Sequence, residues 1–158
     1  MSYKYDFERR NKYRISEDKL VSLFKAKKIP YSRYGVDALD SKLPWWNVPQ
    51  FIRSAPDYII FPDKDKTPFF VESMSLKSGT VKLKKRDLRC YKIWNEYLPV
   101  LFFIYNVDRR LYTKLTLKML LEVIDDVPVK IFDNNPDKEY YDIPASVLPE
   151  FKELITND

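Results

Sequence analysis

The apolar run PVLFFIYN, at residues 99–106, constrains the fold more than any other part of the sequence. It contains no charged side chain and no regular polar alternation, whereas a strand with one face in water alternates apolar and polar residues. A short continuous run of this kind is typical of a strand that is buried on both faces. The run therefore predicts a central strand of a covered sheet.

Patterns on both sides of this run predict alternating helices and strands. The first two thirds of the chain read as helix, strand, strand, strand, helix, strand, which indicates an α/β fold. The expected helices cover 17–28 with Ser16 as the cap, 81–97, 117–124 and a terminal segment within 146–155. The expected strands cover 31–36, 57–61, 69–76, 99–106, 111–115 and 128–132.

Composition excludes several kinds of chemistry. The chain has 158 residues, no histidine, one cysteine and two glycines. Without histidine, the chain can form neither a Ser-His-Asp nor a Cys-His catalytic site, and zinc sites of the usual kinds are excluded. Two glycines are too few for a phosphate-binding glycine-rich loop. The length predicts a single domain, 1–158, and the charged N-terminus and lack of a long apolar run predict a soluble cytoplasmic protein without a membrane span.

Charge is distributed unevenly along the chain. Residues 1–33 and 76–92 are rich in Lys and Arg, and the chain from Glu122 onward is acidic, although the net charge is +5. Such a polarised chain suits a polyanion, because phosphate neutralisation supplies much of the affinity of proteins for nucleic acids. A solvated basic surface that binds nothing explains the same pattern.

Two acids stand in segments that otherwise have the composition of a core. Asp57 begins one expected strand, and Glu72 lies in the middle of the next. Alternation on 69–76 places Glu72 on the same face as Met74. Neighbouring strands would bring the two carboxylates within reach of one hard cation, whereas two acids without a cation would be costly to bury together. The alternative is that Asp57 caps a turn and Glu72 lies at a strand edge.

Over roughly residues 12–106 the chain resembles the PD-(D/E)XK nuclease superfamily, with the restriction-endonuclease-like fold. Pro56-Asp57, Glu72 and a preceding helix with Glu17 carry the resemblance, and a basic helix follows. The layout is most similar to the Holliday-junction-resolvase and RecB-like branches. The resemblance implies an αβββαβ core with a mixed central sheet flanked by helices, followed by a C-terminal α/β extension at about 107–158.

The resemblance also implies roles for individual residues. Asp57 and Glu72 would hold Mg²⁺ or Mn²⁺, and Glu17 would be an outer ligand or assist one. Asp87 and Tyr91 occupy the helix positions where related enzymes carry Gln-x-x-x-Tyr, although Asp87 departs from the Gln. These roles together imply metal-dependent hydrolysis of DNA by an endonuclease or an exonuclease.

Met74 is the main departure from the family pattern. It stands where the family has a lysine that positions the attacking water, and a thioether cannot donate a proton. Lys77 is our preferred replacement, on the condition that the chain turns after Leu76. The alternatives are lysines at the start of the following helix, namely Lys82, Lys84 and Lys85.

Basic and aromatic side chains complete the expected nucleic-acid interface. The basic residues assigned to phosphate contacts are Lys82, Lys84, Lys85, Arg86, Arg89 and Arg14. Trp45 and Trp46 either stack on unpaired bases or anchor the long connection that contains them. DNA is the expected partner in preference to RNA, and a homodimer would suit cleavage of two strands.

Two alternatives to an active nuclease remain open. One is a catalytically weak or inactive module of the same fold that binds nucleic acid or a protein partner, with Met74 as the reason for lost activity. The other is a protein-interaction factor that uses its acidic tail or the Trp45-Trp46 segment.

Overall fold

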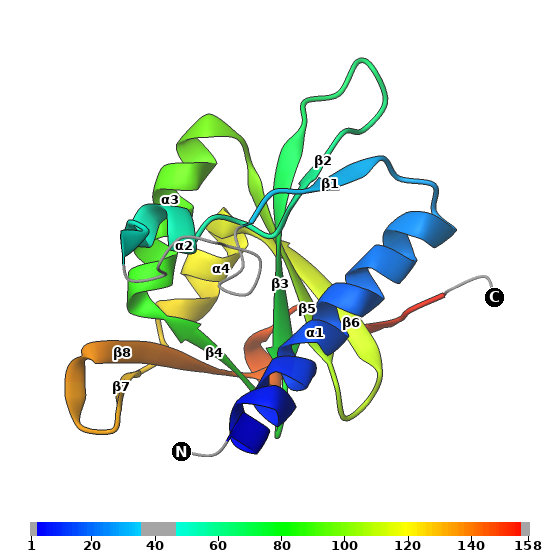
Figure 1. The fold of residues 1–158 in the computed structure, drawn as a ribbon. Coiled ribbons are helices and arrows are strands. Elements are labelled where there is room, and N and C mark those ends of the chain that lie inside the picture. Colours follow the sequence, from blue (N-terminus) through cyan, green and yellow to red (C-terminus); the bar gives the residue numbers. More distant parts are fainter. Residues whose placement is uncertain (1–2, 36–46, 156–158) are drawn as a thin grey trace.

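The chain folds around two β-sheets, as seen in a computed structural model that describes residues 3–35 and 47–155, with side chains described from Ile15 onward. The larger sheet has six strands in the order β1-β2-β3-β5-β6-β9, and the smaller has three in the order β4-β8-β7 (Figure 1). The larger sheet consists of β1 (Tyr31–Arg33), β2 (Tyr58–Ile60), β3 (Phe69–Leu76), β5 (Val100–Asn106), β6 (Leu111–Thr116) and β9 (Lys152–Glu153). The smaller sheet consists of β4 (Thr80–Lys84), β7 (Val129–Phe132) and β8 (Asn135–Pro144).

Helices separate these strands along the chain. They are α1 (Tyr3–Ala26), α2 (Gln50–Arg53), α3 (Lys85–Tyr97) and α4 (Leu117–Ile124), followed by the short 3-10 helix η2 (Ala145–Val147). The order α1-β1-β2-β3-α3-β5 confirms the predicted αβββαβ core, with α2 and β4 inserted into it. Strand β3 pairs parallel to β5, whereas the neighbouring pairs are antiparallel, so the central sheet is mixed as expected.

The central strand is the one predicted from the apolar run. In β5, Phe102 and Ile104 contribute to one hydrophobic cluster, and Phe103 and Tyr105 contribute to the other. Both faces of the strand are therefore covered. A parallel neighbour on one side and an antiparallel neighbour on the other complete its hydrogen bonding.

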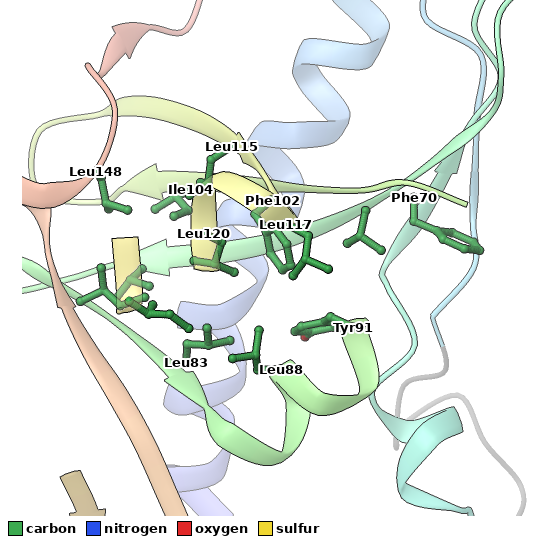
Figure 2. Close-up of a cluster of buried hydrophobic side chains, with 14 of the residues drawn as sticks. Phe70, Leu83, Leu88, Tyr91, Phe102, Ile104, Leu115, Leu117, Leu120 and Leu148 are labelled. Atoms are coloured by element: carbon green, nitrogen blue, oxygen red, sulfur yellow. The ribbon is translucent and has the colours of Figure 1, made fainter. Parts of the chain in front are cut away.

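The two clusters lie on opposite faces of the larger sheet. The larger cluster joins the sheet to α3, α4 and the smaller sheet, with Phe70, Tyr91 and Leu120 among its members (Figure 2). The smaller cluster joins the sheet to α1 through Leu20 and Val71, among others. Side chains on β3 therefore alternate as predicted, which places Glu72 on the face that carries α3.

The first helix is longer than predicted, and Ser16 is not its cap. Helix α1 begins at Tyr3, so Ser16 lies inside it. The Ser16 side chain is 1% exposed, and its hydroxyl is hydrogen bonded to the hydroxyl of Ser75 on β3. The Ser16 hydroxyl is therefore hydrogen bonded to the sheet from within the helix. The predicted role of Ser16 as a helix cap is wrong.

The helix predicted at 81–97 begins later, because its first residues form β4. Val81 and Leu83 are buried and Lys82 and Lys84 are exposed, which is the two-residue period of a strand. Leu83 therefore reaches the core from a strand. Tyr97, at the end of α3, is 69% exposed.

The terminal helix predicted within 146–155 is wrong. This segment contains the end of η2 and the short strand β9, which pairs with β6. Pro149 lies inside the predicted helix, where its ring would clash with the preceding turn and remove a backbone donor. Strand β8, at 135–144, was not predicted at all, because its polar sequence is held by pairing with β4 and β7.

Candidate active site

Asp57 and Glu72 lie together where β2 meets β3. Tyr58 pairs with Val71, so the preceding residue, Asp57, faces the position of Glu72. The Asp57 carboxylate oxygen Oδ2 accepts a hydrogen bond of 2.8 Å from the backbone N–H of Ser73. The structure therefore brings these two sequence-predicted acids together, at neighbouring positions of β3 and the residue that precedes β2.

Glu72 is held in an unusual environment for a carboxylate. Its Oε1 accepts a 2.6 Å hydrogen bond from the hydroxyl of Tyr91, while its Oε2 is buried and has no hydrogen-bond partner among the described residues. Burial raises the pKa of Glu72 well above its ordinary value of 4.5, and the nearby Asp57 carboxylate raises it further. Hydrogen bonds from the Tyr91 hydroxyl and, to a smaller extent, from the Asp57 backbone oppose this rise in pKa but do not reverse it. Without a cation, Glu72 is therefore driven to bind a proton.

Helix α3 supplies the other side of the site. Tyr91 projects from α3 towards the sheet and is 4% exposed (Figure 2). Burial raises the pKa of its hydroxyl well above the ordinary value, and the charge of Glu72 adds to the effect. Tyr91 is therefore a neutral hydrogen-bond donor to Glu72. Asp87, one helical turn earlier, also raises the Glu72 pKa by its charge.

Asp87 connects α3 to the short helix α2. Its Oδ1 accepts hydrogen bonds from the Ser54 hydroxyl at 2.7 Å and from the Gln50 side-chain amide at 3.2 Å. The Arg86 guanidinium lies 3.7 Å from the same carboxylate oxygen. Ser54 and Gln50 were not identified from the sequence, because nothing in the irregular stretch that contains them shows which helix it packs on.

Gly35 fixes the backbone on the outer side of Asp57. The N–H groups of Tyr34 and Gly35 donate to the Asp57 carbonyl at 2.8 and 3.1 Å. A Cβ atom at position 35 would lie 3.1 Å from the Pro56 carbonyl oxygen and 3.2 Å from the Asp57 Cα. These two segments therefore approach more closely than a Cβ atom at position 35 ordinarily allows.

Glu17 is linked to the Asp57–Glu72 pair through Arg33. It forms an ion pair of 2.8 Å with Arg33 on β1, and Arg33 also interacts electrostatically with Asp57. Both Glu17 and Asp57 contribute to raising the pKa of Tyr58 to about 12, for which burial is the largest cause. Because α1 packs on the other face of the sheet, Glu17 approaches Asp57 from the side opposite to Tyr91.

The structure does not bring Lys77 to the carboxylate pair. The chain does turn after Leu76, with positive φ angles of 54° at Ser78 and 82° at Gly79, but the turn is a tight hairpin in which Lys77 and Thr80 bond to each other. Lys77 follows Glu72 by five positions, which corresponds to about 16 Å along a strand. Met74 packs against the larger cluster.

The other candidate basic residues divide into separate groups. Lys82 and Lys84 are exposed on β4, and Lys85 pairs with Glu139 at 3.1 Å. Arg89 is exposed on α3. Trp45 and Trp46 lie outside the described residues, as does the side chain of Arg14.

The carboxylates of Asp57 and Glu72 are the candidate ligands for a divalent cation. Across residues 15–35 and 47–155, no three acidic, histidine or cysteine side chains form a metal-binding cluster. Two carboxylates nevertheless meet here, and the buried Glu72 Oε2 lacks a partner. Mg²⁺ is commonly bound by one or two protein carboxylates and water, so this donor set fits such an ion.

In the part of the chain that the structure describes, no helix is both long and apolar enough to cross a membrane.

Two solved structures are similar to this chain. One is Hjc, a Holliday junction resolvase from the archaeal hyperthermophile Archaeoglobus fulgidus, with a TM-score of 0.49 and 16% identity over 87% of this chain and 95% of that chain. The other is D212, a nuclease from a fusselovirus, with a TM-score of 0.44 and 16% identity over 98% of this chain and 89% of that chain. No protein-family model and no curated protein matches the sequence.

We expect Glu72→Gln to change how stability depends on pH in metal-free protein. Because the folded-state pKa of Glu72 is raised, the unfolded chain loses this proton first, and the wild type loses stability as pH rises above about 4.5. Gln has no proton to lose, so the stability of the variant relative to wild type should increase towards neutral pH, by at most about 1.4 kcal/mol per pH unit.

Urea unfolding in EDTA across this pH range measures the effect. Glu96→Gln, at an exposed position of α3, is the control and should follow the wild type. A constant difference between Glu72→Gln and wild type at all pH values would contradict the expectation.

We expect Gly35→Ala to destabilise the protein by about 1–3 kcal/mol, as overpacking typically does. The added methyl group would meet backbone atoms of Pro56 and Asp57, which cannot rotate away as a flexible side chain could. Urea unfolding of Gly35→Ala beside Ser32→Ala, at an exposed position of β1, measures the cost. Equal stability of the two variants would show that the Asp57 segment moves freely.

Proposed function

We propose that the chain is a divalent-metal-dependent nuclease that hydrolyses DNA phosphodiester bonds, with Asp57 and Glu72 as its metal ligands. One observation carries the proposal. Glu72 lies beside a second carboxylate, that of Asp57, and the Glu72 Oε2 is buried without a hydrogen-bond partner among the described residues. Structural acids rarely occur in this state, because a buried carboxylate oxygen without a partner destabilises the fold. A bound cation would remove this cost.

Each residue of the site has a proposed role. Asp57 and Glu72 would hold Mg²⁺ or Mn²⁺. The ion would supply Lewis-acid chemistry at the scissile phosphate and would lower the pKa of water. Tyr91 fixes the Glu72 carboxylate through its hydrogen bond at Oε1 and leaves Oε2 for the ion. The Ser73 N–H fixes Asp57 in the same way at Oδ2. Arg33 holds Glu17 near Asp57 on the far side, where Glu17 could act only as an outer partner.

DNA is proposed as the substrate on the resemblance to PD-(D/E)XK nucleases. The residues that carry this resemblance are Pro56-Asp57, Glu72 and the preceding helix with Glu17, and a basic helix follows them. Exposed basic side chains on β4 and α3 supply positive charge for flanking phosphates, among them Lys82, Lys84 and Arg89.

A second candidate function follows from Met74. This side chain packs against the larger hydrophobic cluster and occupies the place of the family's lysine. A chain without a group to orient the attacking water would bind metal and nucleic acid but cleave slowly. The alternative is therefore a weakly active or inactive module that binds nucleic acid or a protein partner.

Substitution of the two acids tests the proposed ligands. We expect Asp57→Asn and Glu72→Gln each to reduce Mg²⁺- or Mn²⁺-dependent cleavage more than about 100-fold, which exceeds the usual loss from an outer-shell partner. The assay uses supercoiled plasmid, linear duplex, single-stranded, flapped and four-way-junction DNA. Asp63→Asn, whose side chain is 90% exposed, is the matched control. Full cleavage by both acid variants would overturn the proposal.

Substitution of Met74 separates the two candidate functions. We expect Met74→Lys to raise the cleavage rate at least about tenfold, because a positioned proton-transfer group contributes roughly 10²–10⁴-fold. Position 74 shares a face with Glu72 and lies about 7 Å along the strand, within reach of a lysine amine. Met74→Leu keeps the packing without the charge and should match the wild type. A folded Met74→Lys protein with an unchanged rate would show that a lysine here is not what limits the reaction.

A further inference from the structure

The three-stranded sheet has an outer face that takes no part in the core. Val81 and Leu83 on β4, and Ile143 on β8, point into the larger hydrophobic cluster. The strand register places Lys82 and Lys84 on the opposite face, together with their partners Asp142 and Tyr140. Lys130 on β7 pairs with Tyr140 and joins the same face. In Figure 1 the β7–β8 hairpin projects from the body of the molecule beyond β4.

Two aromatic rings and one ammonium group form a cluster on this outer face. The Lys82 Nζ lies 5.6 Å from the ring centre of Phe132 and 5.4 Å from that of Tyr140. The two rings meet edge to face, with centroids 6.1 Å apart and an interplanar angle of 66°. Phe132 is 46% exposed. Core packing does not account for these rings, because β4 and β8 contribute to the larger cluster through the opposite face, with Val81, Leu83 and Ile143.

The charge of the outer face favours a polyanion. The register places three lysines on it, Lys82, Lys84 and Lys130, and one of the paired acids, Asp142. Asp142 is already paired with Lys130 at 2.7 Å. The face therefore carries net positive charge around one exposed ring, Phe132, and one partly exposed ring, Tyr140.

We propose that this outer face binds unpaired nucleotides, with bases stacking on Phe132 and Tyr140 and phosphates lying against Lys82 and Lys84. Fully or partly exposed rings on a sheet flanked by lysines suit single-stranded nucleic acid, because every base has a flat face and every nucleotide has a phosphate. Duplex DNA hides its base faces and would meet only the lysines. The inference rests on the proposed function for its choice of nucleic acid, and it adds that the substrate has a single-stranded part.

Fluorescence anisotropy with a labelled poly-dT probe of about 20 nucleotides, longer than typical single-strand sites of 4–16 nucleotides, tests the face. The protein carries Glu72→Gln and the buffer contains EDTA, so that no cleavage occurs. We expect Phe132→Ala and Tyr140→Ala each to weaken binding about 5- to 150-fold, which corresponds to 1–3 kcal/mol per stacked base. Lys82→Gln should also reduce the dependence of affinity on salt.

Two variants distinguish stacking from damage to the hairpin. Ile131→Ala removes a side chain that is 52% exposed on the opposite face of the same strand, and should bind poly-dT as the parent does. Phe132→Trp keeps a flat ring and should retain the affinity that Phe132→Ala loses.

The outcomes separate this inference from the proposed function. Poly-dT binding that is unchanged in Phe132→Ala and Tyr140→Ala overturns the inference, and so does an absence of poly-dT binding by the parent protein. An equal loss of affinity in Ile131→Ala also overturns it, because the effect would then belong to the hairpin's fold. Poly-dT binding that depends on the rings supports it even if the protein without Glu72→Gln cleaves nothing, a result that would overturn only the nuclease.

Discussion

The position of Glu72 beside Asp57, with the Glu72 Oε2 buried, is the constraint on which the rest of the site depends. A charged oxygen without a partner is costly in a core, and a second acid nearby increases the cost. Hydrogen bonds from two surrounding segments hold the two carboxylates. Tyr91 holds Oε1 from α3, and the Ser73 N–H holds Asp57 within the sheet. The carboxylates are therefore kept together, and a proton or a cation is the remaining means of relief.

The architecture explains why these contacts are rigid. Glu72 belongs to β3, which is paired along its whole length with the fully covered strand β5, so its backbone cannot move independently of the core. Tyr91 lies on a helix that is tied to α2 through Asp87, Ser54 and Gln50. The close approach of Gly35 to Asp57 completes the enclosure from the side of β1. Three separate parts of the chain thus determine the position of one pair of acids.

Local patterns in the sequence predicted the central part of this arrangement. The run at 99–106 and the alternation at 69–76 depend only on which faces are buried, so they placed β5, β3 and the direction of Glu72 correctly. The smaller sheet could not be predicted in the same way. Val81 and Leu83 have a strand period, but they continue directly into the amphipathic residues of α3, and β8 is polar and is held by distant partners. The bonds from Ser54 and Gln50 to Asp87 were missed for the same reason, since they depend on where α2 docks.

This boundary between β4 and α3 also divides the positive charge of the basic segment 76–92 between a strand and a helix. As a single helix it would have presented a continuous row of positive charge. Because residues 80–84 form a strand, Lys82 and Lys84 point away from the core on the outer face, whereas Lys85 and Arg86 lie beside Glu139 and Asp87 at the start of the helix. Ion pairing offsets part of the charge on the helix. Any affinity of this segment for a polyanion would therefore arise mainly from the sheet, where lysines and aromatic rings lie together.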